Sequence, residues 1–267
     1  LRYLSPMPRE VRNIAIIGSG NVAFHIGKAL KKTQNKLTGV YARNEKTGSR
    51  LAFELGCEYF QDITSIPDEV DIILMAVNDD AVASVVSQIF YPGKIVAHTS
   101  GTVRMEMLEA SSDRYGVFYP LQTLHRDNKV DMFEVPFCIE SNTNWGEGML
   151  MELAASIGDN VHLVNSEQRR TMHLAAVVAC NFSNHLYTLA QQILDTDGLD
   201  LSILKPLIIQ TAENIKNGDP KNLQTGPAIR GDQEVIKKHE AILLEKNPEL
   251  TELYKMLTQS ILSQRNS

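Results

Sequence analysis

One predicted helix carries polar side chains on a face that otherwise holds small apolar residues. The helical pattern runs from about Glu167 to Leu194 and contains no glycine or proline. Spacings of four, three and four residues place on one face His173, Val177, Cys180 and Asn184. His173 could exchange a proton with a substrate oxygen or nitrogen, while the flanking Asn181, or Asn184, orients that substrate. The other interpretation is a core histidine bonded to a backbone carbonyl, and the sequence leaves both open.

Further polar side chains follow two predicted strands and occupy one loop in the second half of the chain. Ser100, in the segment His98–Gly101, and Gln122 are candidate substrate contacts. Arg230 lies in a loop with two glycines and a proline, where it could clamp a substrate carboxylate or a cofactor phosphate. Each position also has a plainer explanation. Ser100 would form a turn and cap, and Arg230 would be a solvated arginine beside an N-cap at Asp232.

A glycine-rich turn near the start of the chain joins a buried strand to a helix. Four apolar residues, Ile14–Ile17, precede Gly18 and Gly20, and Ala23 opens the apolar face of the helix. This is the dinucleotide-binding pattern G-x-G-x-x-G/A, in which helix N–H groups and the helix dipole face a pyrophosphate. The pattern predicts cofactor contacts at Gly18, Ser19, Gly20, Asn21 and Val22. The alternative is a glycine turn without a ligand.

The tip of the second predicted strand bears on the choice of cofactor. An Asp or Glu there would select NAD, but this strand ends in Ala42-Arg43-Asn44, and the first acid is Glu45. Arg43 can instead stack on adenine and bind a 2′-phosphate, with assistance from Lys46. We therefore expect NADP. In the alternative interpretation Arg43 is solvated and Asn44 only caps the helix 45–55.

Two more strands should end at the same edge of the sheet. The apolar run 71–77 ends at Val77 and is followed by Asn78; we expect both residues to approach the cofactor together with His98. Asp79 and Asp80 follow directly. Favourable charge at a helix N-terminus explains them better than a catalytic carboxylate pair, because neighbouring helical residues point in different directions.

The order of elements predicts two domains. Strand and helix patterns alternate over roughly 150 residues, which indicates an α/β domain with a Rossmann-type, doubly wound and mostly parallel sheet. A helix is expected at 103–110 within it. Past Val164 only helical patterns remain, at 167–194, 201–217, 233–245 and 248–263. We therefore predict a dinucleotide-binding domain at 1–165 and an all-helical substrate or dimerisation domain at 166–267.

Composition excludes several classes of protein. The chain has 267 residues, 43% of them hydrophobic, and a net charge of −6, which argues against a general nucleic-acid or anionic-membrane surface. Three dispersed cysteines favour a reducing, cytoplasmic compartment. No apolar run is long enough to cross a membrane, and Leu1–Glu10 does not resemble a signal peptide. No metal-ligand pattern, nucleophile elbow or Walker motif occurs.

Several motifs together resemble a known family. They are Gly18-Ser-Gly20-Asn-Val, Ala42-Arg43-Asn44, His98-Thr-Ser-Gly101, Tyr119-Pro-Leu-Gln122, His173 with Asn181, and Thr225-Gly-Pro to Arg230-Gly-Asp232. The chain resembles the NADP oxidoreductases that join a Rossmann-like N-terminal domain to a helical C-terminal domain. Their superfamily is similar to 6-phosphogluconate dehydrogenase, pyrroline-5-carboxylate reductase and ketopantoate reductase. The resemblance implies an active site between the domains and a homodimer formed through the helices.

One departure from the superfamily bears on mechanism. Its hydroxyacid members use a lysine followed four residues later by an asparagine on the long helix. This chain has His173 and Val177 in that region, so the hydroxyacid mechanism does not carry over. We expect hydride transfer between NADP(H) and a small carbonyl or imine. The alternative is an NADP-binding sensor or regulatory protein without catalytic activity.

Overall fold

The computed structural model describes residues 11–265, and the chain divides into two compact units between Val177 and Val178. The prediction made for Leu1–Glu10 lies outside the described residues. We placed the domain boundary after residue 165. A helix does begin at Ser166, but its first three turns belong to the unit that contains the sheet. Within the described part of the chain, no helix is long and apolar enough to cross a membrane.

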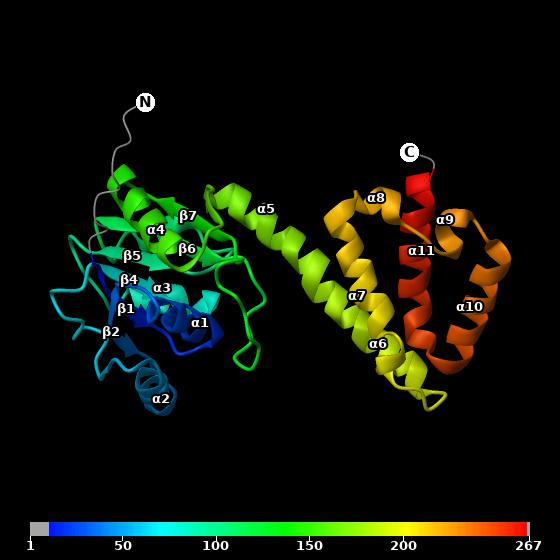
Figure 1. The fold of residues 1–267 in the computed structure, drawn as a ribbon, viewed down its shortest axis with the longest axis horizontal. Coiled ribbons are helices and arrows are strands. Elements are labelled where there is room, and N and C mark those ends of the chain that lie inside the picture. Colours follow the sequence, from blue (N-terminus) through cyan, green and yellow to red (C-terminus); the bar gives the residue numbers. More distant parts are fainter. Residues whose placement is uncertain (1–10, 266–267) are drawn as a thin grey trace. The chain divides into compact units, whose positions relative to one another are not determined.

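The first unit contains an eight-stranded sheet in the order β3-β2-β1-β4-β5-β6-β7-β8 (Figure 1). Neighbouring strands are parallel except β6 and β7, which are antiparallel. This confirms the predicted Rossmann-type, mostly parallel sheet. The strands are β1 (Asn13–Ile17), β2 (Lys36–Tyr41), β3 (Glu58–Phe60), β4 (Ile72–Met75), β5 (Ile95–His98), β6 (Arg114–Pro120), β7 (Phe137–Ser141) and β8 (Val161–Leu163).

The strand register brings the ends of four strands into one row. Ile17 pairs with Tyr41 on one side and with Met75 on the other, and Met75 pairs with His98. The segments that follow β1, β2, β4 and β5 therefore leave the sheet at a single edge, which is where ligands bind in doubly wound folds. His98 pairs with Val117, and β6 continues beyond it to Pro120.

Helices cover both faces of the sheet, which explains why its strands are apolar runs rather than alternating ones. One apolar cluster includes Ile14 and Ile16 with residues of α1, α2 and α4, and the opposite cluster includes Ala15 and Ile17 with residues of α3. The helices of this unit are α1 (Asn21–Leu30), α2 (Glu45–Leu55), α3 (Val82–Val86), α4 (Asn144–Ile157) and α5 (Ser166–Ala176), with 3₁₀ turns η1 (Asp79–Ala81) and η2 (Met105–Leu108).

The helix predicted at 103–110 is wrong, because only η2 forms there. The hydroxyl of Ser100 accepts hydrogen bonds from the N–H groups of Thr102 and Val103, both at 3.0 Å. Arg104 is extended, with ψ at 144°. A side-chain turn thus replaces the first helical turn, as Ser and Thr side chains often do.

The long helix predicted at 167–194 is present but is not uniform. α5 leads into a π-helical segment, η3 (Val177–Phe182), and then into α6 (Ser183–Asp195). Hydrogen bonds from i to i+5 add a residue to the turn, so residues beyond η3 fall out of the α-helical register. The single uniform stripe from His173 to Asn184 was therefore a wrong inference, because it assumed one period throughout.

The rest of the second unit consists of helices and 3₁₀ turns, of which α10 and α11 are the longest. Asp232 caps α10 by accepting from the N–H of Val235 at 3.2 Å, as the plainer explanation required. α10 and α11 pack side by side (Figure 1). The elements are η4 (Leu201–Ile203), α7 (Lys205–Asn214), η5 (Ile215–Asn217), α8 (Pro220–Leu223), α9 (Pro227–Arg230), α10 (Gln233–Lys246), η6 (Pro248–Leu250) and α11 (Thr251–Arg265).

Candidate functional site

The turn after β1 depends on glycine at two positions for different reasons. Gly18 has φ of 125°, and a Cβ atom there would collide with the carbonyl oxygen of Ala76. Its N–H donates to the carbonyl of Tyr41 at 2.8 Å, which ties the turn to the end of β2. Gly20 has an ordinary φ of −79°, and a Cβ atom there would meet no atom within 4 Å. Gly18 is thus required by the fold, whereas Gly20 leaves space open.

The open space lies at the N-terminus of α1. Gly20 is the N-cap residue of this helix, and no side chain caps its first N–H groups. These donors and the helix dipole form the arrangement that binds phosphate groups in dinucleotide sites. The residues present therefore fit the pyrophosphate of a dinucleotide.

A cavity of about 470 Å³ adjoins this turn. Its lining comes from the segments that leave β1, β2 and β4 at the common edge. Seven predicted cofactor residues contribute to it: Gly18, Ser19, Gly20, Arg43, Asn44, Val77 and Asn78. Four others do not line it, namely Asn21, Val22, Lys46 and His98. Asn21 and Val22 open α1, and Lys46 is exposed in the first turn of α2.

The tip of β2 presents a cation rather than a carboxylate to the cavity. Arg43 is exposed and lines the cavity, and it forms no ion pair with any residue between 11 and 265. Asn44 caps α2 by accepting from the N–H of Thr47 at 3.1 Å and also lines the cavity. Glu45 begins α2 itself. An arginine without an acid at this position suits a 2′-phosphate better than a free ribose hydroxyl.

His98 ends β5 and orders the turn that follows it. Its side chain is fully buried, and its Nδ1 accepts from the N–H of Ser100 at 3.2 Å. Burial, together with the charge of Arg169, lowers the pKa of His98 to about 4, so the imidazole is neutral at physiological pH. The side chain thus shapes the turn at Ser100. Its predicted contact with a cofactor stays a prediction.

The predicted substrate contacts near this edge differ in their surroundings. Ser100 is buried and its oxygen accepts two backbone bonds, which leaves the hydroxyl proton available to donate. Gln122 is exposed after β6, and its Oε1 accepts from the N–H of Thr123. Asp79 accepts from the hydroxyl of Thr102 and begins η1, which agrees with the structural role that we favoured for it.

A tyrosine and a histidine meet at the same edge. The hydroxyl oxygen of Tyr119 lies 3.0 Å from Nδ1 of His173, and both side chains are half-buried. Burial raises the pKa of Tyr119 to about 12, so it keeps its proton at neutral pH. A Cβ atom on Gly101 would lie 2.5 Å from His173 Nδ1 and 2.9 Å from Tyr119 Cζ. Glycine at 101 therefore leaves the room that this pair occupies.

Arg169 holds the start of α5 against the sheet. Its fully buried guanidinium pairs with Glu140 of β7 and donates to the carbonyl of Val103 at 2.6 Å. Glu140 also accepts from the N–H and hydroxyl of Ser166. Arg169 precedes His173 by four residues, so both lie on the helix face that meets the sheet. We did not predict Arg169 or Tyr119 as site residues. The spacing from His173 was the signal for Arg169.

The remaining predicted site residues belong to the second unit. Asn181 lies within η3 and Asn184 in the first turn of α6, and both are exposed. Arg230 ends α9 and is exposed. His239 of α10 forms a hydrogen bond with the hydroxyl of Tyr254 at 2.9 Å. Roles for Asn181, Asn184 and Arg230 in substrate binding stay predictions.

Comparison with known proteins agrees with this arrangement. The model described as “Rossmann-like domain” matches residues 6–125, and the model described as “Domain of unknown function (DUF2520)” matches residues 135–261. A crystal structure described as a “putative NADP oxidoreductase” from Bacteroides fragilis is 35% identical to the chain. The match covers 95% of this chain and 98% of that one, with a TM-score of 0.87. The chain belongs to this family.

More distant members of the fold extend the comparison. A Thermotoga maritima protein is 21% identical over 95% of this chain and 100% of its own, with a TM-score of 0.79. A reductive aminase from Aspergillus terreus, in complex with NADPH and ethyl levulinate, is 13% identical over 96% and 95%, with a TM-score of 0.69. At these identities the likeness establishes the fold shared with the family. No curated protein matches the chain.

Proposed function

We propose that the protein is an NADP-dependent oxidoreductase that transfers hydride between the nicotinamide and a small carbonyl or imine. The observation that carries the proposal is the Tyr119–His173 pair, which lies at the same sheet edge as the uncapped N-terminus of α1. One edge thus combines a fit for a dinucleotide with a group able to exchange a proton. The family of the Bacteroides fragilis protein supports NADP, and the fold shared with a reductive aminase supports a C=O or C=N substrate.

The cofactor would be held by the first half of the sheet. The pyrophosphate would lie against the N–H groups after Gly20, and Arg43 would pair with the 2′-phosphate. Val77 and Asn78 line the same cavity. When bound, the nicotinamide supplies or accepts the hydride, and the protein contributes position and a proton.

His173 would supply that proton in the direction of reduction. The imidazolium gives its Nε2 proton to the substrate oxygen or nitrogen as the carbon receives the hydride. Its Nδ1–H donates to the hydroxyl oxygen of Tyr119, which fixes the ring orientation. Because Tyr119 stays protonated, it adds no negative charge that would hold the imidazolium proton back. Arg169, one turn earlier, positions the helix and does not touch the substrate.

A kinetic experiment tests the catalytic assignment. NADPH oxidation is measured with panels of small ketones, ketoacids and cyclic imines, for the full chain and for His173→Gln, Tyr119→Phe and the control His162→Gln, an exposed histidine on β8. We expect kcat to fall about a hundredfold or more in His173→Gln, less in Tyr119→Phe, and not at all in the control. Full activity in His173→Gln would remove its role. Tight NADPH binding without turnover of any compound would favour the alternative, an NADP-binding sensor or regulatory protein without catalytic activity.

A binding experiment tests the cofactor assignment separately. Arg43→Ala should weaken the binding of NADPH much more than the binding of NADH, because only NADPH carries the 2′-phosphate. Gly20→Asp should weaken both, because a carboxylate at the N-cap would occupy the N–H donors and repel phosphate. Asp fits this position without strain, since its φ is −79° and the space is open. Equal losses in Arg43→Ala would contradict the 2′-phosphate assignment.

We also propose that a second copy of the chain binds the helical unit. α6 and α7 have no buried residue, although they carry Leu186, Leu207 and Ile209. Ile203 and Leu207 are each 64% exposed and four residues apart, so they continue one apolar face from η4 into α7. Exposed apolar faces of this kind are typical of protein interfaces.

A further inference from the structure

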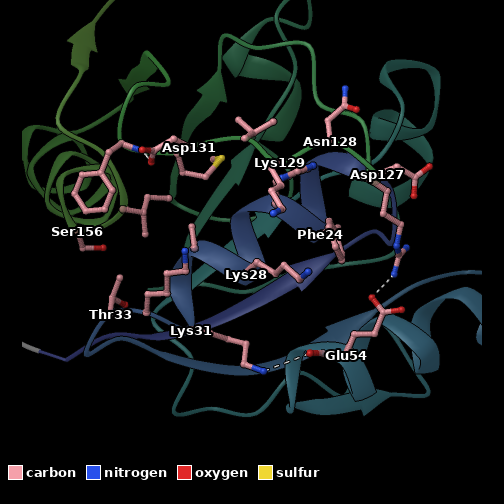
Figure 2. A pocket seen from close by; sticks show the side chains of 18 residues that line it. Phe24, Lys28, Lys31, Thr33, Glu54, Asp127, Asn128, Lys129, Asp131 and Ser156 are labelled. Carbon is pink, nitrogen blue, oxygen red and sulfur yellow. Dashed lines mark hydrogen bonds and ion pairs between the residues drawn. The ribbon is translucent and has the colours of Figure 1, made fainter.

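A second and larger cavity lies in the sheet unit, away from the dinucleotide turn. It measures about 1030 Å³ and is formed by α1, the loop 126–133, and the ends of α2 and α4 (Figure 2). None of the residues that line it also lines the cavity beside Gly18 and Gly20. No step proposed above uses it.

The charge of this cavity opposes the charge of the chain. The whole chain has a net charge of −6. The cavity lining has five cationic side chains against three carboxylates. The cationic ones are Lys28, Lys31, Lys32, Arg126 and Lys129, and the carboxylates are those of Glu54, Asp127 and Asp131.

None of the three carboxylates forms an ion pair with a lysine of the lining. Glu54 pairs with Arg126 at 2.5 Å and with Arg50 at 2.9 Å, and the hydrogen bond from Arg126 lowers the pKa of Glu54. Asp131 accepts from the N–H of Phe133 at 3.1 Å. Asp127 is highly exposed and lies 3.7 Å from the ring of His125. The carboxylates therefore do not neutralise the lysines.

The lysines stand on facing walls of the cavity. Lys28 and Lys31 project from α1, and Lys129 extends from the loop toward that helix (Figure 2). Within residues 11–265 none of these three forms an ion pair; the Lys31 ammonium instead donates to the Glu54 carbonyl at 3.3 Å. A favourable interaction with the C-terminus of α1 explains Lys28 and Lys31. It does not explain Lys129, which belongs to another element.

Two cations are held in place by one aromatic ring. The Lys28 ammonium lies 4.3 Å and the Arg126 guanidinium 4.5 Å from the centre of the Phe24 ring. Such cation–π contacts restrict flexible side chains before a ligand arrives. Around them, Met132 and Ile157 are buried apolar side chains in the cavity lining.

We propose that this cavity binds a phosphorylated small molecule. Lysines act as point charges that can surround a compact, multiply charged phosphate from several directions. Arg126 already pairs with Glu54, and the lining contains no other arginine. The cavity therefore has no free arginine that could bind a ligand carboxylate through two parallel hydrogen bonds. The apolar residues would contact the organic part of the ligand. The proposal does not depend on the proposed reaction.

Calorimetric titration of the full chain with inorganic pyrophosphate at low salt tests this site. The dinucleotide turn could also bind the probe, so the titration is repeated with Gly20→Asp, which closes that turn. We expect Gly20→Asp to retain one binding event. When Lys28→Gln/Lys129→Gln is added to Gly20→Asp, that event should be at least about tenfold weaker, because two charged contacts are lost. Lys28→Arg/Lys129→Arg should bind nearly as the natural chain does.

Matched controls separate this site from general attraction to lysine. Lys237→Gln/Lys238→Gln removes the same charge from exposed positions on α10 and should leave pyrophosphate binding unchanged. The four substituted lysines are all exposed, so thermal melting should show that every lysine variant is folded. The proposal is overturned if the chain does not bind pyrophosphate or if Gly20→Asp abolishes binding. Equal affinity in Gly20→Asp with and without Lys28→Gln/Lys129→Gln would also overturn it.

Discussion

The two units of the chain bury their apolar residues to very different degrees. In the sheet unit Ile14, Ile72 and Ile95 are among many side chains with no exposed surface. In the helical unit the buried side chains come mainly from α9, α10, α11 and their connections, while α6 and α7 contribute none. A self-contained core stabilises its unit by itself, whereas uncovered helices need other contacts. The sheet unit thus has a self-contained core, whereas α6 and α7 leave apolar side chains exposed.

The same contrast holds for the candidate site residues. His173 belongs to the sheet unit, where its ring forms a hydrogen bond with Tyr119 and occupies the room left by Gly101. One turn earlier, the ion pair of Arg169 with Glu140 holds the helix against the sheet. Asn181 and Asn184 are exposed in the helical unit. Preorganised groups can do chemistry as they stand, while exposed ones need a ligand or a partner to order them.

The largest expected effect comes from removing the buried anchor of the sheet unit. Arg169→Ala should lower the free energy of unfolding by about 3–5 kcal/mol, because Glu140 and the carbonyl of Val103 lose their partner inside the protein. Urea unfolding measures the change. Arg170→Ala, which removes an exposed pair with Glu167, should change it by less than about 1 kcal/mol. Equal small losses would mean that α5 is not anchored through Arg169.

An intermediate effect should appear as a pH dependence that originates in the sheet unit. Unfolded histidine binds a proton below pH about 6.5, but folded His98 resists protonation until about 4, so stability falls as the pH falls between these values. Between pH 7.5 and pH 5, the free energy of unfolding should fall by about 2 kcal/mol more in the natural chain than in His98→Asn, as measured by urea unfolding. Val96→Ala, a neighbouring core variant that does not titrate, should keep the natural pH dependence. Identical slopes in His98→Asn and the natural chain would contradict this origin.

The smallest effect on folding is expected on the uncovered face of the helical unit. Ile203→Gln/Leu207→Gln should change the unfolding free energy of the monomer by no more than about 0.5 kcal/mol, because both side chains are already exposed. The double variant should instead weaken dimer formation. The molar mass measured by light scattering should then be lower for the variant than for the natural chain and closer to that of the monomer. Phe53→Gln, an exposed apolar position in the sheet unit, should leave the mass unchanged. A natural chain that is monomeric at high concentration would end the dimer proposal.

Local patterns predicted the elements of the sheet unit closely. The predicted helix 45–55 agrees with α2, whose N-cap is Asn44. Caps and glycine turns act over a few residues, so they can be recognised in the sequence. The helix expected at 103–110 failed because the Ser100 turn competed with it, and sequence alone does not decide that competition.

The candidate site shows the same division. Gly18, Gly20 and Arg43 could be named as candidates because the strand–turn–helix pattern around them is local. The contacts that Tyr119 and Arg169 make could not be predicted, because their partners lie 54 and 29 residues away along the chain. The uniform stripe on the long helix failed because η3 changes the period within it.

The sequence by itself thus determined the alternation of strands and helices, the glycine-rich turn after β1 and the cation at the tip of β2, because each depends on contacts between residues close in the chain. The tertiary structure decided which distant groups meet. It brought Tyr119 to His173 and buried Arg169 against Glu140. It also gathered lysines from α1 and from the loop 126–133 around one cavity. These contacts depend on how the strand register and the helix faces pack, and no local pattern carries that information.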